Sequence, residues 1–137
     1  MRRFSAAVIV LVIGWLGASG AVADNVPNRV YELRTITATA GNLERLLARF
    51  QDHAIQLYLK NGIQVVGYWE RLDKDAVGAQ VVAVLSHARR DEARYSWEKF
   101  HADPAWLAVA EASNADGPLV AGVVSTFMEP TDFSPLK

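Results

Sequence analysis

The chain has 137 residues, of which 51% are hydrophobic and 21% are charged, with a formal net charge of −1. This length and composition are typical of one globular domain and too short for two domains of ordinary size. The charge balance argues against a nucleic-acid partner, which needs a basic face for the phosphate backbone. The chain has no cysteine, so disulfides and thiol chemistry are excluded.

Residues 1–23 have the pattern of a signal peptide. Arg2 and Arg3 come first, residues 6–16 form an uncharged apolar run, and Ala21 and Ala23 are small residues at the positions that a signal peptidase reads. We therefore expect cleavage after Ala23 and a periplasmic or secreted protein. An uncleaved membrane anchor is the alternative, and it would be the only membrane contact. The predicted single domain, residues 24–137, has a net charge of −3, because cleavage removes Arg2 and Arg3 from the total of −1.

The first part of the domain predicts a strand followed by a helix. Residues 30–37, VYELRTIT, are rich in β-branched and aromatic side chains that alternate in character. From residue 42 the apolar residues recur at helical spacing, and Thr39 is a plausible N-cap. Asn61 and Gly62 predict the end of this helix, because glycine tolerates the left-handed conformation.

The second part predicts a hairpin, a broken helix and a last strand. Residues 63–72 and 79–87 are strands joined by a short polar turn, and residues 89–102 return to helical spacing. Ala93, Trp97 and Phe100 form the inward stripe of that helix, which predicts a core role for Trp97. Asp103 and Pro104 predict a new short helix up to about residue 112. Residues 119–129 form a strand that is apolar on both faces, which predicts burial on both sides.

The element order β-α-β-β-α-β predicts an α+β, ferredoxin-like fold, in which two helices cover one face of a four-stranded antiparallel sheet. The second face also needs a cover, since the strands are too apolar for one wet side. The strand residues behind this expectation are Val65, Val81, Ala83, Leu85, Val123 and Val124. A homodimer with its two sheets packed face to face would bury them.

Several segments resemble the NIPSNAP family in the same order along the chain. They are VYELRTITATAGNLERLLARF, GYWERL, LSHARRDEARYSWEKFHADPAW, ADGPLV and PTDFSP. The resemblance covers essentially the whole of residues 24–137. It implies a dimeric α/β barrel, a fold shared with cofactor-independent monooxygenases, and it implies fold and dimer more firmly than activity.

Two strand residues carry groups suited to chemistry. Arg34 could bind a carboxylate or an enolate through its guanidinium fork, or it could form a salt bridge with Glu32 or Glu70. His87 could act as a catalytic general base at the end of its strand, or it could bond to the backbone. We expect both residues on the apolar second face of the sheet.

Three strand aromatics, Tyr31, Tyr68 and Trp69, are further candidates for ligand binding, although an aromatic on a strand is core by default. Tyr68 and Trp69 are adjacent and must face opposite sides of the sheet. His53 and His101 are interpreted as surface or packing residues. The histidine spacing predicts no metal site, and no motif in the sequence predicts a cofactor.

Three functions remain open. The protein could be an exported dimer that binds a small apolar or aromatic molecule without catalysis. It could be a cofactor-independent monooxygenase, in which His87 deprotonates the substrate and Arg34 holds the anion. It could also be a structural or interaction protein whose barrel is filled by side chains.

Overall fold

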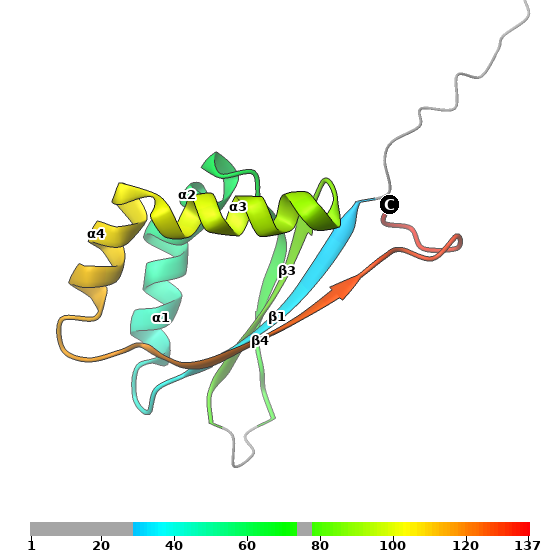
Figure 1. The fold of residues 1–137 in the computed structure, drawn as a ribbon. Coiled ribbons are helices and arrows are strands. Elements are labelled where there is room, and N and C mark those ends of the chain that lie inside the picture. Colours follow the sequence, from blue (N-terminus) through cyan, green and yellow to red (C-terminus); the bar gives the residue numbers. More distant parts are fainter. Residues whose placement is uncertain (1–28, 74–77) are drawn as a thin grey trace, which may run out of the picture.

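The computed structural model of the protein describes residues 29–73 and 78–137, so the predicted signal peptide lies outside the described residues. The elements follow the expected order (Figure 1). They are β1 (Val30–Ala38), α1 (Leu43–Arg49), the π-helical segment η1 (Phe50–Ala54), α2 (Ile55–Lys60), β2 (Gln64–Glu70), β3 (Gln80–His87), α3 (Arg90–Ala102), α4 (Pro104–Ser113) and β4 (Val120–Met128).

The sheet has four antiparallel strands in the order β2-β3-β1-β4. This order and the β-α-β-β-α-β succession confirm the ferredoxin-like α+β fold. The helices lie on one face of the sheet, and the last residues of the chain extend beyond β4 on the other side (Figure 1). β1 is central and pairs with both β3 and β4, so every second side chain of β1 faces the middle of the helical layer.

The chain ends its helices where the sequence predicts. Gly62 has a φ of 85°, a left-handed conformation that favours glycine after α2. The Asp103 carboxylate caps α4 by accepting from the Ala105 backbone N–H at 3.0 Å, and Pro104 follows it. The prediction of Thr39 as the first N-cap is wrong, because Asn42 occupies that position. The Thr39 hydroxyl instead donates to the Pro118 carbonyl at 2.7 Å.

The core lies between the helices and the sheet and is built around large side chains. Phe100 and Leu46 are among the largest fully buried ones. Phe100 packs at 4.8 Å from Tyr58, 5.6 Å from Trp97 and 4.5 Å from Trp106, measured between ring centroids. This aromatic cluster joins α2, α3 and α4 to one another and fixes α3 over the central strands.

The strand residues divide between the two sheet faces differently from the expectation. Val81, Ala83 and Leu85 are at most 1% exposed and belong to the core under the helices, and Val65 packs against that core. Their direct neighbours along the strands must therefore point to the open face. Val82 and Val84 are such neighbours, and Leu33 and Trp69 share their face because they pair with Val84 and Val82 across the sheet. The open face is apolar as predicted, but with these other residues.

β4 is an exposed edge strand in the single chain, where neither of its faces has the predicted burial, and burial of its open face by a second copy stays a prediction. Val123 and Val124 are 43% and 67% exposed. The physical reason is position: β4 pairs only with β1, and its outer edge has no neighbouring strand among the described residues. Within residues 29–73 and 78–137, the helices lack the combination of length and hydropathy that a membrane span requires.

Candidate ligand-binding site

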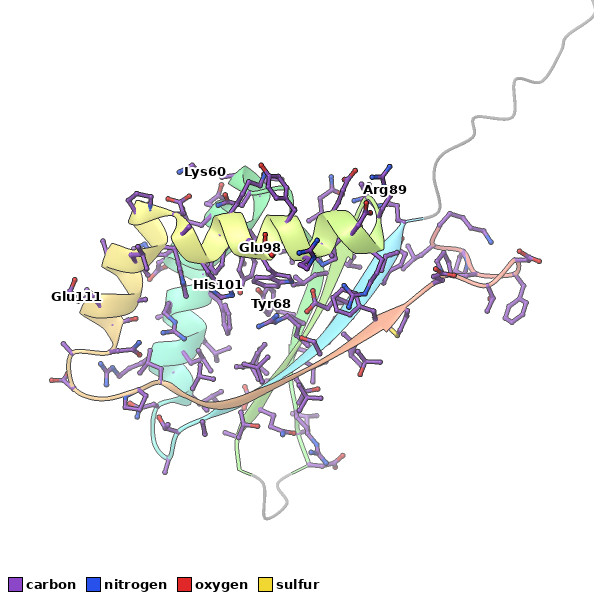
Figure 2. All side chains as sticks on the ribbon, viewed as in Figure 1. Lys60, Tyr68, Arg89, Glu98, His101 and Glu111 are labelled. Carbon is purple, nitrogen blue, oxygen red and sulfur yellow. The ribbon has the colours of Figure 1, made fainter. Side chains whose placement is uncertain are left out.

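A cavity of about 500 Å³ lies between α3 and the strands β1 and β4. Its lining combines charged side chains with aromatic rings: Glu32, Arg34, Arg90, Arg94, Trp97, Glu98, His101, Ser125 and Phe127. Figure 2 shows His101 on the side of α3 that faces the sheet, whereas Arg89 and Glu111 point away from the body of the protein. One face of α3 therefore lines the cavity, through residues such as His101, and the opposite face contacts solvent.

The Glu32 carboxylate is the centre of the hydrogen-bond network beside this cavity. Only 1% of Glu32 is exposed. Its Oε2 lies 2.9 Å from His87 Nε2 and accepts from Trp97 Nε1 at 2.8 Å, and its Oε1 accepts from Arg34 Nη1 at 3.1 Å. Burial alone would raise the pKa of Glu32, but the hydrogen bonds from His87, Trp97 and Ser125 and the charge of Arg34 lower it to about 2.

Arg34 is held in place and still reaches the cavity. Its guanidinium lies 4.1 Å from the Trp97 ring centroid and forms the ion pair with Glu32, two residues earlier on the same strand face. The Arg34 side chain is 17% exposed. The salt bridge with Glu32 that the sequence allowed is present, but Arg34 lies on the helix side of the sheet, against Trp97 of α3, and not on the open face as predicted. A role of its remaining guanidinium donors in anion binding stays a prediction.

His87 lies on the helix side of the sheet rather than on the open face that we expected. The residue is 1% exposed, and the described lining of the cavity does not include it. Because Glu32 is ionised at neutral pH, His87 Nε2 must carry a proton and donate to it. His87 Nδ1 is buried without a hydrogen-bond partner among the described residues.

The rim and the far wall of the cavity are positive and aromatic. The Arg90 guanidinium lies 3.6 Å from the Phe127 ring centroid, and the His101 ring stacks on Trp97 at 5.7 Å. Burial and then the charge of Arg34 lower the pKa of His101, which favours its neutral form. Arg94 pairs with Glu98 at 3.4 Å on the exposed rim.

The sequence interpretation missed most of this site. Glu32 was considered only as a partner of Arg34, Trp97 only as core, and His101 as a surface or packing residue. One signal was present: Trp97 and His101 are four residues apart, so they share one helix face. The contact of that face with Glu32 joins residues 65 positions apart and has no local signature.

The other predicted residues lie elsewhere. Tyr31 is on the open side, donates its hydroxyl to the Lys137 carbonyl at 2.9 Å, and lines a separate cavity of about 310 Å³ under the C-terminal residues. Tyr68 lies under the helices against Phe50, with ring centroids 5.1 Å apart. Trp69 is 53% exposed on the open face, so the two neighbours face opposite sides as predicted. None of these three aromatics is in the described lining of the cavity that Arg34 reaches.

Among residues 29–73 and 78–137, no group of three or more His, Cys, Asp or Glu side chains is arranged to hold a metal ion. What the arrangement offers chemically is different: an oriented guanidinium, aromatic walls and a buried carboxylate that stays ionised. Such a site suits a small planar molecule with a negative charge.

Comparisons with known proteins place the chain in a family. Several solved structures share its fold, among them a NIPSNAP family protein of unknown function from Agrobacterium tumefaciens (23% identity, TM-score 0.67, 81% of this chain and 96% of that chain). Another A. tumefaciens NIPSNAP family protein has 21% identity and a TM-score of 0.67, with 80% and 99% covered. An uncharacterized NIPSNAP domain protein from Burkholderia xenovorans has 23% identity and a TM-score of 0.65, with 77% and 98% covered.

No curated protein matches the chain at a significant level. The NIPSNAP family model matches residues 31–135, which include every element from β1 to β4 apart from the first residue of β1. The chain therefore belongs to the NIPSNAP family.

Proposed function

We propose that this NIPSNAP protein is an exported homodimer whose cavity beneath α3 binds a small aromatic anion, a carboxylate or an enolate. One observation carries the proposal. The Arg34 guanidinium is fixed by Glu32 and Trp97 and lines a cavity of about 500 Å³ whose walls include Phe127 and His101. A positioned guanidinium binds a carboxylate through paired hydrogen bonds, and aromatic walls bind a planar ring.

The net charge of the lining supports an anion rather than a neutral or cationic ligand. Arg34, Arg90 and Arg94 contribute three positive charges, against Glu32 and Glu98. Glu32 is already enclosed by three donors, so its charge faces the protein. Glu98 pairs at the rim with Arg94, and the two side chains are 60% and 76% exposed, so water screens both charges and the positive balance comes from Arg34 and Arg90.

A binding assay with matched probes tests the proposal. The mature protein is titrated with 1-naphthoate and with the neutral 1-naphthamide by isothermal titration calorimetry. We expect 1-naphthoate to bind at least about tenfold more tightly, since only the carboxylate pairs with Arg34. Arg34→Gln removes that pairing and should abolish the preference. Equal binding of the two probes by the wild-type protein would contradict the proposal.

Two further variants guard against a loss of folding in Arg34→Gln. Arg94→Gln removes a charge from the exposed rim of the cavity and should weaken 1-naphthoate binding. Arg89→Gln removes the same charge from the start of α3, where the side chain is 60% exposed and is paired with Asp91 away from the cavity. It should leave binding unchanged. Equal losses in both variants would indicate a nonspecific charge effect and refute the assignment of the cavity.

A cofactor-independent oxygenase is the second candidate, and one observation favours it. Glu32 orients His87 through Nε2, and His87 Nδ1 has no hydrogen-bond partner in the described part of the chain, an arrangement typical of a carboxylate-supported base. His87 would then accept a proton from an acidic substrate. Oxygen uptake with 1-naphthol as the probe tests this. Uptake by the wild type that is lost in His87→Ala supports the enzyme, and unchanged uptake in the variant removes His87 from catalysis.

The homodimer is part of the proposal because the open sheet face is apolar and exposed. Val66, Trp69 and Val124 are 43%, 53% and 67% exposed. Packing of two such faces would bury them and give a barrel. Native mass spectrometry tests the dimer. Val124→Glu should produce monomers, whereas Leu59→Glu, on the 62%-exposed surface of α2, should not. A monomeric wild-type protein would contradict this part.

Export rests on the sequence pattern of residues 1–23. Intact-mass measurement of the protein from its own cells tests it, and a chain that begins at Asp24 is expected. A chain that keeps residues 1–23 would favour the membrane-anchored alternative.

A further inference from the structure

A second group of basic side chains lies in a groove between α4 and the α1–η1 region, apart from the cavity under α3. The polar end of this groove is a cavity of about 230 Å³, and Arg45, Arg49, Asp52, His53 and Ser113 are among its lining residues. Asp52 and His53 belong to η1, and a π-helical turn frequently occurs at a functional site. α4 packs against α1 and η1 beside it (Figure 1).

Arg49 is the unusual residue of this groove, because it is a buried cation without an acidic partner in the described part of the chain. The residue is 8% exposed. Its Nη1 donates only to the neutral oxygens Ser113 Oγ at 3.3 Å and Asn114 Oδ1 at 3.4 Å, both long for such bonds. Its Nε is buried without a hydrogen-bond partner among residues 29–73 and 78–137. A buried charge in this state is costly, so an anion that pairs with it would stabilise the folded protein.

The surroundings of Arg49 also favour an anion. Arg45 adds a second positive charge and is anchored by its bonds to Asn42 Oδ1 and the Ser113 carbonyl, both at 3.1 Å. It also pairs at 3.5 Å with Asp116, whose side chain is 85% exposed, so solvent screens that countercharge. The exposed Asp52 opposes an anion, but solvent screens its charge. Burial lowers the pKa of Arg49, which is the direction expected for a cation that lacks a countercharge.

The groove continues as an apolar channel. A neighbouring cavity of about 440 Å³ shares His53 and Ser113 with the polar end and is otherwise lined by Ala108, Val109 and Ala112 of α4. These small side chains leave space along the helix surface. One continuous groove thus has a cationic end at Arg49 and an apolar end along α4.

From this juxtaposition we propose that the α1–α4 groove is a second ligand site, which binds an amphiphilic carboxylate with its head group at Arg49 and its aliphatic chain along Ala108, Val109 and Ala112. The carboxylate would accept from the guanidinium edge formed by Nε and Nη2, and this pairing satisfies the orphaned Nε donor while Nη1 keeps its bonds to Ser113 and Asn114. The site shares no lining residue with the cavity under α3.

Isothermal titration calorimetry with sodium octanoate tests the site on the mature protein. We expect octanoate to bind at least about tenfold more tightly than acetate, which lacks the chain, and than 1-octanol, which lacks the charge. Chemical shifts of the Ala108 and Ala112 methyl groups should change on addition of octanoate. Inorganic phosphate that binds as tightly as octanoate, or shift changes confined to the α3 cavity, would overturn the proposal.

Variants of two kinds keep the test independent of folding defects. Arg49→Met removes the cation with little change in side-chain length and should reduce octanoate affinity at least about tenfold. Ala112→Glu adds a negative charge on the exposed surface of α4, where it should repel the ligand without affecting the core. Arg89→Met is the matched control and should bind octanoate like the wild type. Unchanged affinity in Arg49→Met or Ala112→Glu would refute the site.

Discussion

Arg34 and Arg49 lie in similar surroundings, yet their charges are compensated differently. Each guanidinium lies over a tryptophan, Arg34 at 4.1 Å from the Trp97 ring centroid and Arg49 at 5.5 Å from that of Trp106. Arg34 also has the buried carboxylate of Glu32, whereas the oxygens that Arg49 contacts in the described part of the chain are neutral. An arginine that a carboxylate holds in position can select a ligand. A buried arginine without a countercharge lowers the stability of the folded protein unless an anion binds to it.

The largest expected loss of unfolding free energy comes from breaking the Glu32–Arg34 ion pair. Glu32→Gln keeps the size of the side chain but leaves Arg34 without its counterion and gives His87 and Trp97 a weaker acceptor. Loss of one partner of a buried pair costs roughly 3 to 5 kcal/mol of unfolding free energy. Urea denaturation measures it. Glu98→Gln, on the exposed rim, is the control and should change stability by less than about 0.5 kcal/mol. Equal effects would show that burial of Glu32 is unimportant.

Truncation of the ring over Arg34 should cost somewhat less. Trp97 is half-buried, packs edge-on against Tyr58 with ring centroids 5.3 Å apart, and donates to Glu32. Trp97→Ala removes both contacts, and we expect a loss of about 3 kcal/mol in urea denaturation. Trp97→Phe keeps the packing and loses only the hydrogen bond, so its loss should be close to 1 kcal/mol. A loss below that value in Trp97→Ala would contradict the structural role.

The Glu32–Arg34 pair should make the free energy of unfolding depend on pH in acidic solution. The folded-state pKa of Glu32 is about 2, below its ordinary 4.5, so its contribution is fully present above pH 4.5. It is lost as the pH falls from 4.5 towards 2 and amounts to about 3 kcal/mol. Denaturation midpoints between pH 6 and 2 measure this, within the range where the protein folds.

Comparison with Glu32→Gln isolates this contribution. Asp103, whose pKa Lys60 and Asn61 also lower to about 2, loses its own contribution over a similar range in both proteins. The slope of stability against pH should therefore be shallower in the variant but not flat. Identical slopes would mean that Glu32 does not titrate as described.

The smallest expected change in the free energy of unfolding is a gain and not a loss. Arg49→Met replaces the uncompensated cation with an apolar side chain of similar length, which fits against Trp106. Such replacements are neutral or stabilising, and we expect a gain of about 1 kcal/mol without ligand. Thermal unfolding measures it, with Arg89→Met as the surface control. A loss of several kcal/mol in Arg49→Met would mean that the bonds to Ser113 and Asn114 already compensate the charge.

The strands, the helix ends at Gly62 and Asp103, and the family were predictable from the sequence, because their signals are local, whereas the predicted N-cap Thr39 was wrong. The alternation in VYELRTIT, the left-handed position at Gly62 and the Asp103-Pro104 start of α4 each depend on a few neighbouring residues. Helical spacing could not reveal the π-helical segment η1, because residues 42–61 keep an apolar stripe throughout. The family resemblance followed from several such segments in one order, and the family model agrees with it.

The candidate site was only half predictable. The sequence identified Arg34 and His87 as groups suited to chemistry, and Tyr68 and Trp69 as neighbours on opposite faces. It predicted the apolar open face for Arg34 and His87, as polar groups within a barrel interior, whereas both lie on the helix side of the sheet beside Glu32. It also predicted burial for β4, whose apolar residues in fact lie at the sheet edge.

The sequence by itself determined that Glu32 and Arg34 share one face of a strand, since side chains alternate with a period of two. Only the tertiary structure decided which face. Packing of α3 over β1 supplies Trp97, and the pairing of β3 with β1 supplies His87. Together these donors compensate the desolvation of a buried carboxylate, and they come from positions 55 and 65 residues further along the chain. No local pattern contains that compensation, because it exists only once the elements have packed.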